Sequence, residues 1–187
     1  MFIPEPRKAH EGGDTVITRR EMAAGLAVMA GLAPAYGKAR LSEDGLYQTE
    51  WYLDSFLDLA EDLGTASRDG KRFAILWGLR NCPACRRMHE VHLADPATEA
   101  YIRENFAILH LNILGAREVT DFDGTKLSEK AFAARYGIVG TPAIQFFPAS
   151  AEGLAARRPQ EREAARMASL PEPEAFLALF RTVRGGT

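Results

Sequence analysis

The sequence contains very little cysteine. Only two of its 187 residues are cysteines, Cys82 and Cys85, and just two residues separate them. The chain therefore has no disulfide framework that could join distant segments. A disulfide between these two would close a loop too short to stabilise the fold much by restricting the unfolded chain. A purely structural disulfide is thus the weaker interpretation of the pair.

The sequence also lacks an excess of charge of either sign, and it has no internal repeat. Its 23 Lys and Arg residues nearly balance its 25 Asp and Glu residues, leaving a net charge of −2. This balance argues against nucleic acid as a partner, because proteins that bind nucleic acid usually present a strongly basic surface. Beyond residue 35 no apolar segment approaches the roughly 20 residues that span a bilayer, so we expect no membrane span in the mature protein.

The first 35 residues resemble an export signal. Arg19 and Arg20 precede an apolar, Ala/Gly-rich stretch at residues 22–33, and a small-residue site, Ala33-Pro34-Ala35, follows it. The paired arginines favour a cleaved twin-arginine signal; a general secretory signal is the alternative, and an uncleaved anchor is less favoured. We predict an export signal at 1–35, a polar leader at 36–49 and one domain at 50–187. Export would place the domain in an oxidising compartment, the periplasm.

Cys82 and Cys85 lie between an apolar run and a helix-like stretch. Residues 73–77 predict a strand buried on both faces, and residues 82–93 predict a helix. A strand that ends in CxxC and continues into a helix is typical of a thioredoxin-like redox centre. In such a centre one thiolate attacks a substrate disulfide and the second cysteine resolves the mixed disulfide.

The position of the two cysteines on the predicted helix suggests different roles. If the helix begins near Cys82, unpaired backbone N–H groups and the helix dipole lower the pKa of that thiol below its ordinary value of roughly 8.5. Arg80, Arg86 and Arg87 flank the motif and act in the same direction, and Pro83 suits the first helical turn. Cys85 lies one turn deeper. We therefore assign Cys82 as the attacking thiol and Cys85 as the resolving thiol.

Hydrophobic periodicity and capping residues predict the remaining elements. Strands alternate with helices, as in an α/β sheet, and Asp123-Gly124 is typical of a hairpin turn. A calcium site at Asp121 and Asp123 is disfavoured because the rest of a ligand loop is missing. The predicted elements are a helix at 50–63 ended by Gly64, a helix at 96–105 capped by Asp95, a strand at 106–113, a hairpin within 115–127, a helix at 129–136 capped by Ser128, a strand after Pro142, an edge strand followed by helix or loop within 154–168, and a helix at 173–183.

Three motifs together resemble exported proteins of the thioredoxin fold. They are the strand–CPAC–helix segment, the turn Gly140-Thr141-Pro142 before residues 143–147, and the export signal. The run CPACRRMH at 82–89 and the hairpin segment 117–130 further resemble the periplasmic SoxW-type thioredoxins, which are associated with bacterial sulfur-compound oxidation. The resemblance covers roughly residues 50–180. It implies a thioredoxin-like α/β fold: a central mixed sheet flanked by helices, with a β-hairpin insertion around 115–127.

The resemblance also implies an activity and its site. The protein would be a thiol–disulfide oxidoreductase with Cys82 as nucleophile and Cys85 as resolver, and with no cofactor or metal beyond the redox-active disulfide. Pro142 would be cis and pack against the motif, and Thr141 would offer its backbone to an extended substrate segment. Pro83, Ala84 and Gly140 would complete the substrate-binding surface. The expected partners are cysteine-containing periplasmic proteins as substrates and a membrane thiol-reductant donor.

The sequence departs from ordinary thioredoxins at two positions. Leu76 stands where thioredoxins carry a buried Asp six residues before the first cysteine, so the acceptor for the proton of Cys85 is open: water, or a neighbouring Glu or His. Asn81 stands where thioredoxins have the Trp that directly precedes the motif.

Other functions remain open on the sequence alone. A disulfide-forming oxidant would have a reduction potential near about −120 mV, against about −270 mV for a thioredoxin-like reductant. The two cysteines, with His89, also suit copper(I) binding and transfer. A non-catalytic binding module is the third alternative. For His89 and His92 we favour helix-face residues satisfied by water or a carboxylate over metal ligands.

Overall fold

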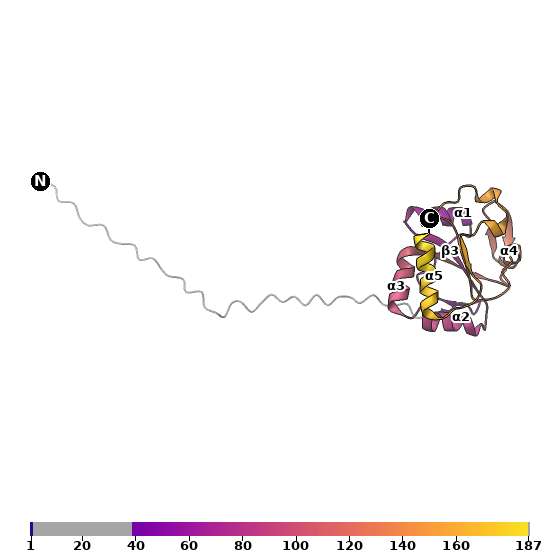
Figure 1. The fold of residues 1–187 in the computed structure, drawn as a ribbon, viewed down its shortest axis with the longest axis horizontal. Helices are drawn as coiled ribbons and strands as arrows, with labels where there is room; N and C mark the ends of the chain where they lie inside the picture. The colour runs from indigo at the N-terminus through magenta and orange to yellow at the C-terminus, as the bar shows by residue number, and fades with distance from the viewer. Residues whose placement is uncertain (2–38, 187) are drawn as a thin grey trace. The chain divides into compact units, whose positions relative to one another are not determined.

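The computed structural model describes residues 39–186, together with Met1 (Figure 1). The predicted export signal at 1–35 lies outside the described residues. Within the part of the chain that is described, no helix combines the length and apolarity needed to cross a membrane.

A mixed sheet of four strands forms the centre of the fold, in the order β4-β3-β7-β8. The central strand β3 (Arg72–Gly78) runs parallel to β4 (Phe106–Asn112), with Arg72 opposite Phe106. On its other side β3 pairs antiparallel with β7 (Ala143–Phe146), and β7 pairs antiparallel with the edge strand β8 (Ala165–Met167). The predicted strands at 73–77 and 106–113 are confirmed.

Helices cover both faces of the sheet, which explains why β3 is apolar along its whole length. Alternate β3 side chains, such as Phe73 and Trp77, pack under α1 (Leu59–Arg68) and α4 (Glu129–Arg135). The intervening side chains, such as Leu76, face the opposite core, which is built from α3 (Pro96–Asn105) and α5 (Pro173–Gly185). In Figure 1 α3 and α5 lie side by side. Each core excludes water from one side of the strand that leads to the cysteines.

The predicted helix at 50–63 is wrong in both boundaries. Helix α1 begins at Leu59, where Asp58 caps it by accepting the N–H groups of Ala60 and Glu61 at 3.1 Å. Leu57 has φ +64°, a left-handed backbone that a helix does not accommodate. The apolar spacing of residues 51–57 therefore belongs to an irregular segment, and the helix continues through Gly64 to Arg68.

The other helices follow the sequence closely. Asp95 caps α3 and Ser128 caps α4, each by a side-chain oxygen that accepts a backbone N–H. The predicted helix at 82–93 is divided into a short α-helix, α2 (Pro83–Arg87), and a π-helical turn, η1 (Met88–His92). The wider turn begins at Met88, three residues after Cys85.

Two small hairpins lie outside the central sheet. Strands β5 (Glu118–Thr120) and β6 (Lys126–Ser128) form the predicted insertion around Asp123-Gly124. Strands β1 (Arg40–Leu41) and β2 (Tyr47–Gln48) form an N-terminal hairpin, which the interpretation of this stretch as a polar leader did not foresee.

The insertion is fastened by buried ion pairs. Asp121 is 1% exposed and Arg162 is 2% exposed; the Arg162 guanidinium lies 2.9 Å from Asp121 Oδ1 and 2.9 Å from Asp123 Oδ2. The two carboxylates considered as calcium ligands are thus paired with an arginine.

Within 154–168 the predicted order of elements was wrong. Two 3₁₀ turns, η2 (Leu154–Ala156) and η3 (Pro159–Glu161), come first, and the edge strand β8 follows them.

Candidate redox site

The two cysteines form a disulfide at the end of β3, with their Cα atoms 5.2 Å apart. Asn81, with φ +58°, makes the sharp turn between the strand and α2. Cys82 then occupies the N-cap of α2 and Pro83 its first helical position, where the missing proline N–H costs no hydrogen bond. The predicted start of the helix at the first cysteine is confirmed.

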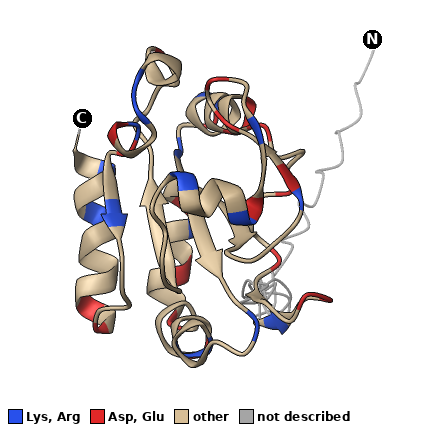
Figure 2. Ribbon diagram, turned by 90° about the vertical axis from the view of Figure 1, so that its right-hand side faces the viewer, with Lys and Arg blue, Asp and Glu red and all other residues tan. Residues whose placement is uncertain are grey.

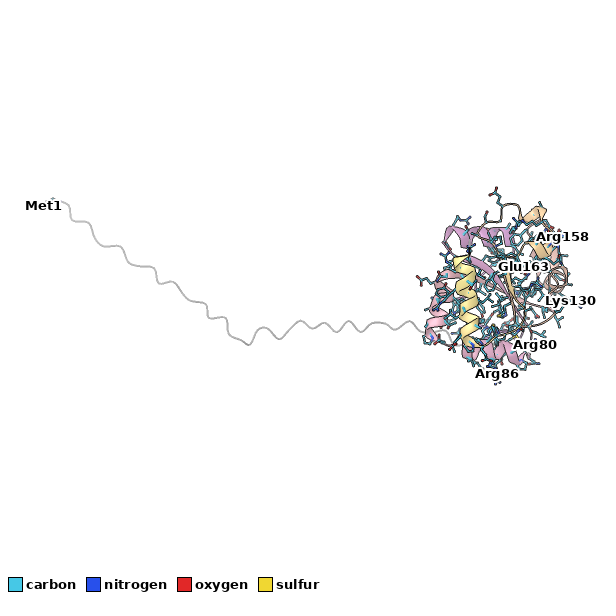
Figure 3. All side chains as sticks on the ribbon, viewed as in Figure 1. Met1, Arg80, Arg86, Lys130, Arg158 and Glu163 are labelled. Carbon is cyan, nitrogen blue, oxygen red and sulfur yellow. A yellow bond between two sulfur atoms is a disulfide. The ribbon has the colours of Figure 1, made fainter. Side chains whose placement is uncertain are left out.

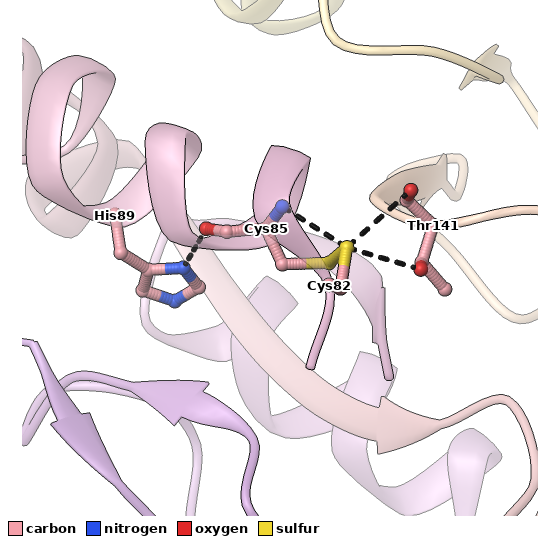
Figure 4. The surroundings of a disulfide bond; sticks show 4 residues. All are labelled: Cys82, Cys85, His89 and Thr141. Atoms are coloured by element: carbon pink, nitrogen blue, oxygen red, sulfur yellow. Dashed lines mark hydrogen bonds between the residues drawn. A yellow bond between two sulfur atoms is a disulfide. The ribbon is translucent and has the colours of Figure 1, made fainter. Parts of the chain in front are cut away.

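The sulfur of Cys82 lies among polar groups from two segments (Figure 4). The backbone N–H of Cys85 donates to Cys82 Sγ at 3.0 Å, and Thr141 Oγ1 donates to the same sulfur at 3.3 Å. The carbonyl oxygen of Thr141 lies 3.6 Å from Cys82 Sγ. Cys82 is 7% exposed and Cys85 2%. The arrangement directs two donors at one sulfur and places the other sulfur deeper in the protein.

The flanking arginines contribute less than the sequence suggested. Arg86 pairs with Glu90 at 3.2 Å and Arg87 with Glu172 at 3.0 Å, with all four side chains more than half exposed. Arg80 donates through Nε to the carbonyl oxygen of Asp44 at 3.0 Å. Exposed ion pairs interact weakly across water. The helix start, the Cys85 N–H and the Thr141 hydroxyl are therefore the main groups that favour a thiolate at Cys82.

The turn before β7 completes the site. The Thr141–Pro142 peptide bond is cis, as predicted. Pro142 is buried, and Thr141, partly exposed, contacts Cys82 Sγ, so residues 59 positions apart in the sequence meet. Gly140 is exposed and precedes Thr141, and Pro83 is exposed on the other side of Cys82. The structure thus brings the predicted site residues to one end of the sheet.

A groove of about 610 Å³ opens beside Cys82 on the side of α2. The N-terminal hairpin contributes Tyr47 to its wall, although no sequence pattern indicated that this segment approaches the cysteines. The groove is lined by Tyr47, Asn81, Cys82, Pro83, Arg86, Arg87, Glu90 and Val91.

His89 lies behind the disulfide, and its surroundings differ from those expected. Rather than facing water or a carboxylate, it is 3% exposed. Its Nδ1 lies 2.8 Å from the carbonyl oxygen of Cys85 and its Nε2 lies 2.7 Å from the hydroxyl of Tyr52. Burial lowers the pKa of His89 to about 4. The spacing of four residues from Cys85 could have placed the ring above that carbonyl, but no sequence signal pointed to Tyr52.

A second buried histidine lies beside His89. The ring centroids of His89 and His110 are 6.2 Å apart, and each lies within 6 Å of the Tyr52 ring centroid. Burial, together with the charges of His89 and Arg117, lowers the pKa of His110 to about 3. Both imidazoles are consequently neutral near pH 7, and the volume behind the disulfide holds polar but uncharged side chains.

His92, the other histidine considered as a metal ligand, points elsewhere. Its Nε2 lies 2.9 Å from the carbonyl oxygen of Pro171, and its ring packs against Phe176. Within residues 39–186 no group of three or more His, Cys, Asp or Glu side chains is arranged to hold a metal ion.

Comparison with known proteins agrees with this geometry. A family model described as a thioredoxin-like domain matches residues 59–182. A thioredoxin from Thermus thermophilus is similar in structure, with a TM-score of 0.50 and 22% identity over 69% of this chain and 87% of that one. At this identity the likeness shows the fold alone. The match and the four-stranded sheet confirm the predicted fold class.

Two further solved structures are more distant. A thioredoxin-fold protein from Helicobacter pylori has 19% identity and a TM-score of 0.49, over 63% of this chain and 71% of that one. The oxidoreductase DsbH has 16% identity and a TM-score of 0.47, over 78% and 96%. No curated protein sequence matches the chain.

Proposed function

The chain belongs to the thioredoxin-like domain family, and from this premise we propose that it is a thiol–disulfide oxidoreductase that exchanges its Cys82–Cys85 pair with protein disulfides. One observation carries the proposal. Cys82 Sγ lies at the N-cap of α2 and accepts hydrogen bonds from the Cys85 N–H and the Thr141 hydroxyl, with the second sulfur of the pair directly behind it. Donors aimed at a sulfur stabilise its thiolate, which is the nucleophile of disulfide exchange.

In the reduced protein the Cys82 thiolate attacks one sulfur of a substrate disulfide. The substrate S–S bond breaks, a mixed disulfide forms, and the second substrate sulfur leaves as a thiolate that takes up a proton. Cys85 then loses its proton and attacks Cys82 Sγ, which releases the first substrate sulfur and forms the Cys82–Cys85 disulfide of this structure. Two electrons and two protons pass to the substrate, and an external dithiol restores the reduced protein.

Strand β3 offers no carboxylate at position 76 to receive the proton of Cys85. Leu76, where thioredoxins carry Asp, is 2% exposed and packs in the core beneath α3 and α5. His89 is a poor acceptor because burial lowers its pKa to about 4. We therefore assign this proton to the departing substrate thiolate, through water, since the thiolate of an ordinary thiol, with a pKa of roughly 8.5, is a stronger base than His89.

Substrate binding falls to the two segments that border Cys82. Thr141 is partly exposed beside the sulfur, so its backbone groups suit an extended substrate segment that pairs in the manner of a β-strand. Gly140 and Pro142 position that backbone. Pro83 and Ala84 form the opposite border at the start of α2.

We place this activity in the periplasm, as a reductant of the SoxW type that serves cysteine-containing proteins, including those of sulfur-compound oxidation, and that receives electrons from a membrane thiol donor. The support lies in the sequence: the signal-like residues 1–35, the motif at 82–89 and the segment 117–130. Detection of the cleaved protein in a periplasmic fraction tests the location.

Cysteine variants test the exchange reaction. We expect the wild-type protein to catalyse insulin reduction by dithiothreitol and Cys82→Ser to be inactive. Cys85→Ser should accumulate mixed disulfides with substrate proteins, because the first attack proceeds and the resolving step is missing. Accumulation on Cys82→Ser but not on Cys85→Ser would reverse the assigned order of attack.

The reduction potential of the couple tests the direction of electron flow. Equilibration of the full chain with a thiol buffer, followed by alkylation of free thiols, gives this value. A potential near about −270 mV supports a reductant, whereas one near about −120 mV contradicts it and supports the oxidant alternative.

A further inference from the structure

His89 is a buried group in contact with the redox motif that the exchange reaction leaves unused. It belongs to the π-helical turn that follows α2, and its ring turns back toward the motif. The carbonyl oxygen of Cys85 can only accept a hydrogen bond, so Nδ1 at 2.8 Å carries the proton. In the neutral ring Nε2 then has no proton and accepts the hydroxyl of Tyr52 at 2.7 Å. The two contacts select one tautomer and one ring orientation.

The surroundings of His89 keep it in that state. Tyr47 from β2, Tyr52 from the segment before α1, and His110 from β4 lie against the ring. Arg117, the charged residue that acts on this group of rings, donates to the carbonyl oxygen of His110 at 3.0 Å. Burial lowers the pKa of His89 to about 4 and raises that of Tyr52, so the donor and acceptor roles persist across the neutral range.

Cys85 connects this group to the reactive sulfur. Its carbonyl accepts from His89, while its N–H donates to Cys82 Sγ at 3.0 Å. Helix α2 has only five residues, and an isolated helix of that length does not hold its own geometry in water. An anchor on the Cys85 peptide therefore bears directly on the hydrogen bond that stabilises the Cys82 thiolate.

From these contacts we infer that His89 is a positioning residue of the redox centre, and that Tyr52, which lies before the matched domain at 59–182, acts through it. His89 holds the Cys85 peptide so that its N–H remains directed at Cys82 Sγ, and Tyr52 holds His89 in the tautomer that donates to Cys85. The inference rests on the proposed exchange function. It makes a segment outside the matched domain part of the redox centre.

The test compares reduction potentials and the pH dependence of Cys82 alkylation in full-length variants. His89→Phe removes both hydrogen bonds while keeping an aromatic ring. Because the Cys85 N–H then supports the thiolate less well, the reduced form loses stability and the pKa of the Cys82 thiol rises. We expect the equilibrium constant for reduction to fall about tenfold, which is 29.6 mV for a two-electron couple. His89→Asn should restore most of the difference, because its amide can donate to the Cys85 carbonyl.

Tyr52→Phe removes a single oxygen and should lower the same constant about threefold, as expected for one neutral hydrogen bond. If Tyr52 acts through His89, adding Tyr52→Phe to His89→Phe should change nothing further. His92→Phe is the matched control: His92 lies in the same π-turn and is 1% exposed, but it bonds to the Pro171 carbonyl rather than to the motif. It should cost stability and leave the potential unchanged.

Three results would overturn the inference: an unchanged potential in both His89→Phe and Tyr52→Phe, an equal shift in His92→Phe, or additive effects in the double variant. Should His89→Phe fail to fold, Tyr52→Phe alone decides, because its potential either shifts or does not. Failure of the proposed function looks different. In that case the wild-type protein itself would not reduce insulin, whereas an active wild type with an insensitive potential refutes only the role of His89.

Discussion

Two polar clusters, each with a buried centre, lie in different parts of this molecule, and they differ in charge. The redox-side cluster, Tyr52, His89 and His110, is uncharged near pH 7. The hairpin-side cluster, Asp121, Asp123, Tyr136 and Arg162, consists of ion pairs. In Figure 3 the labelled Arg86, in α2, and Arg158, four residues before Arg162 in the sequence, lie well apart.

The difference shows that the charged residues that hold the insertion in place lie apart from the residues that control the reactivity of Cys82. A buried charge close to Cys82 would shift the thiolate equilibrium strongly, because charges interact over longer distances in the protein interior than in water. The redox side instead relies on backbone and hydroxyl donors. The hairpin side, remote from the sulfurs, uses full charges to fix the insertion to the segment before β8. Figure 2 shows that residues of both charge signs are interspersed along the described chain.

The largest effect on stability is expected from breaking the charged cluster. Arg162→Met removes the buried arginine that pairs with Asp121 and Asp123 and leaves Arg135, which is 25% exposed, as the arginine that still pairs with both. Removing one member of a buried ion pair costs about 3–5 kcal/mol, and we expect a loss near the lower end of that range. Urea unfolding of the variant measures this loss. The potential of the Cys82–Cys85 couple should stay at its wild-type value, because the cluster does not contact the redox motif.

Arg158 provides the matched control for this change. It also pairs with a carboxylate, Glu161, but its side chain is 80% exposed. Arg158→Met should therefore cost less than about 1 kcal/mol. Equal losses in the two variants would show that burial of the Arg162 pairs contributes nothing.

Lowering the pH is expected to destabilise the folded protein through the uncharged cluster. The pKa of His89 is about 4 in the folded protein against 6.5 for an exposed histidine, so the unfolded chain binds more protons between these values. Stability from this group is complete above pH 6.5 and is lost as the pH falls to 4. At 1.36 kcal/mol per pKa unit the loss amounts to about 3 kcal/mol.

Urea unfolding of wild type and His89→Phe across this pH range measures the difference in slope. Other groups titrate in the same window: Asp62, whose pKa burial raises to about 6, contributes a slope of opposite sign. The contribution of Asp62 cancels in the difference between the two proteins, whereas that of His110 changes in His89→Phe, because the charge of His89 is one cause of its lowered pKa. Parallel curves would mean that His89 is not buried as a neutral ring.

Substituting one glycine in each region with alanine tests how the packing of that region affects stability and the reduction potential. A Cβ on Gly78 would lie 2.5 Å from His110 Nε2, and one on Gly115 would lie 1.9 Å from Glu129 Oε2. Each alanine substitution should cost about 1–3 kcal/mol, the usual penalty for overpacking. Gly78→Ala should also shift the reduction potential, because His110 packs with Tyr52 and His89. Gly115→Ala should shift it much less, because Glu129 is linked to this group only indirectly, through Arg117, which donates to Glu129 and to the His110 carbonyl. An equal shift with Gly115→Ala would show that the two regions are coupled.

The sequence was sufficient for elements whose signals are local. Asp95, Ser128 and the apolar run at 73–77 placed two helix starts and the central strand correctly, because caps and continuous apolar runs act within a few residues. Segment 50–58 was misassigned because its apolar spacing is that of a helix. In the folded protein Leu57 has a positive φ and Asp58 caps α1, so the helix cannot begin before Leu59.

In the candidate site, too, some contacts could be predicted from local sequence motifs and others could not. The meeting of Cys82 with Thr141 could be expected from the motifs, and the contact is present. The roles of Tyr47 and Tyr52 could not, because the approach of the N-terminal hairpin and the segment after it depends on tertiary packing against β4 and η1 rather than on any local pattern. His89 was noticed as a residue, but its partners were not.

A small effect on stability, with no effect on the redox site, is expected from removing a helix cap on the hairpin side. Ser128 accepts the N–H of Ala131 at 3.2 Å at the start of α4, and replacing such a cap with alanine costs about 1 kcal/mol. Ser128→Ala should lower the midpoint of urea unfolding without changing the insulin-reduction rate or the potential. Helix α4 supports the core through Phe132, which stacks on Trp77 in the strand that leads to Cys82. A changed potential would therefore mean that strain passes along β3 from the fastened region to the reactive one, and the separation between the two clusters would fail.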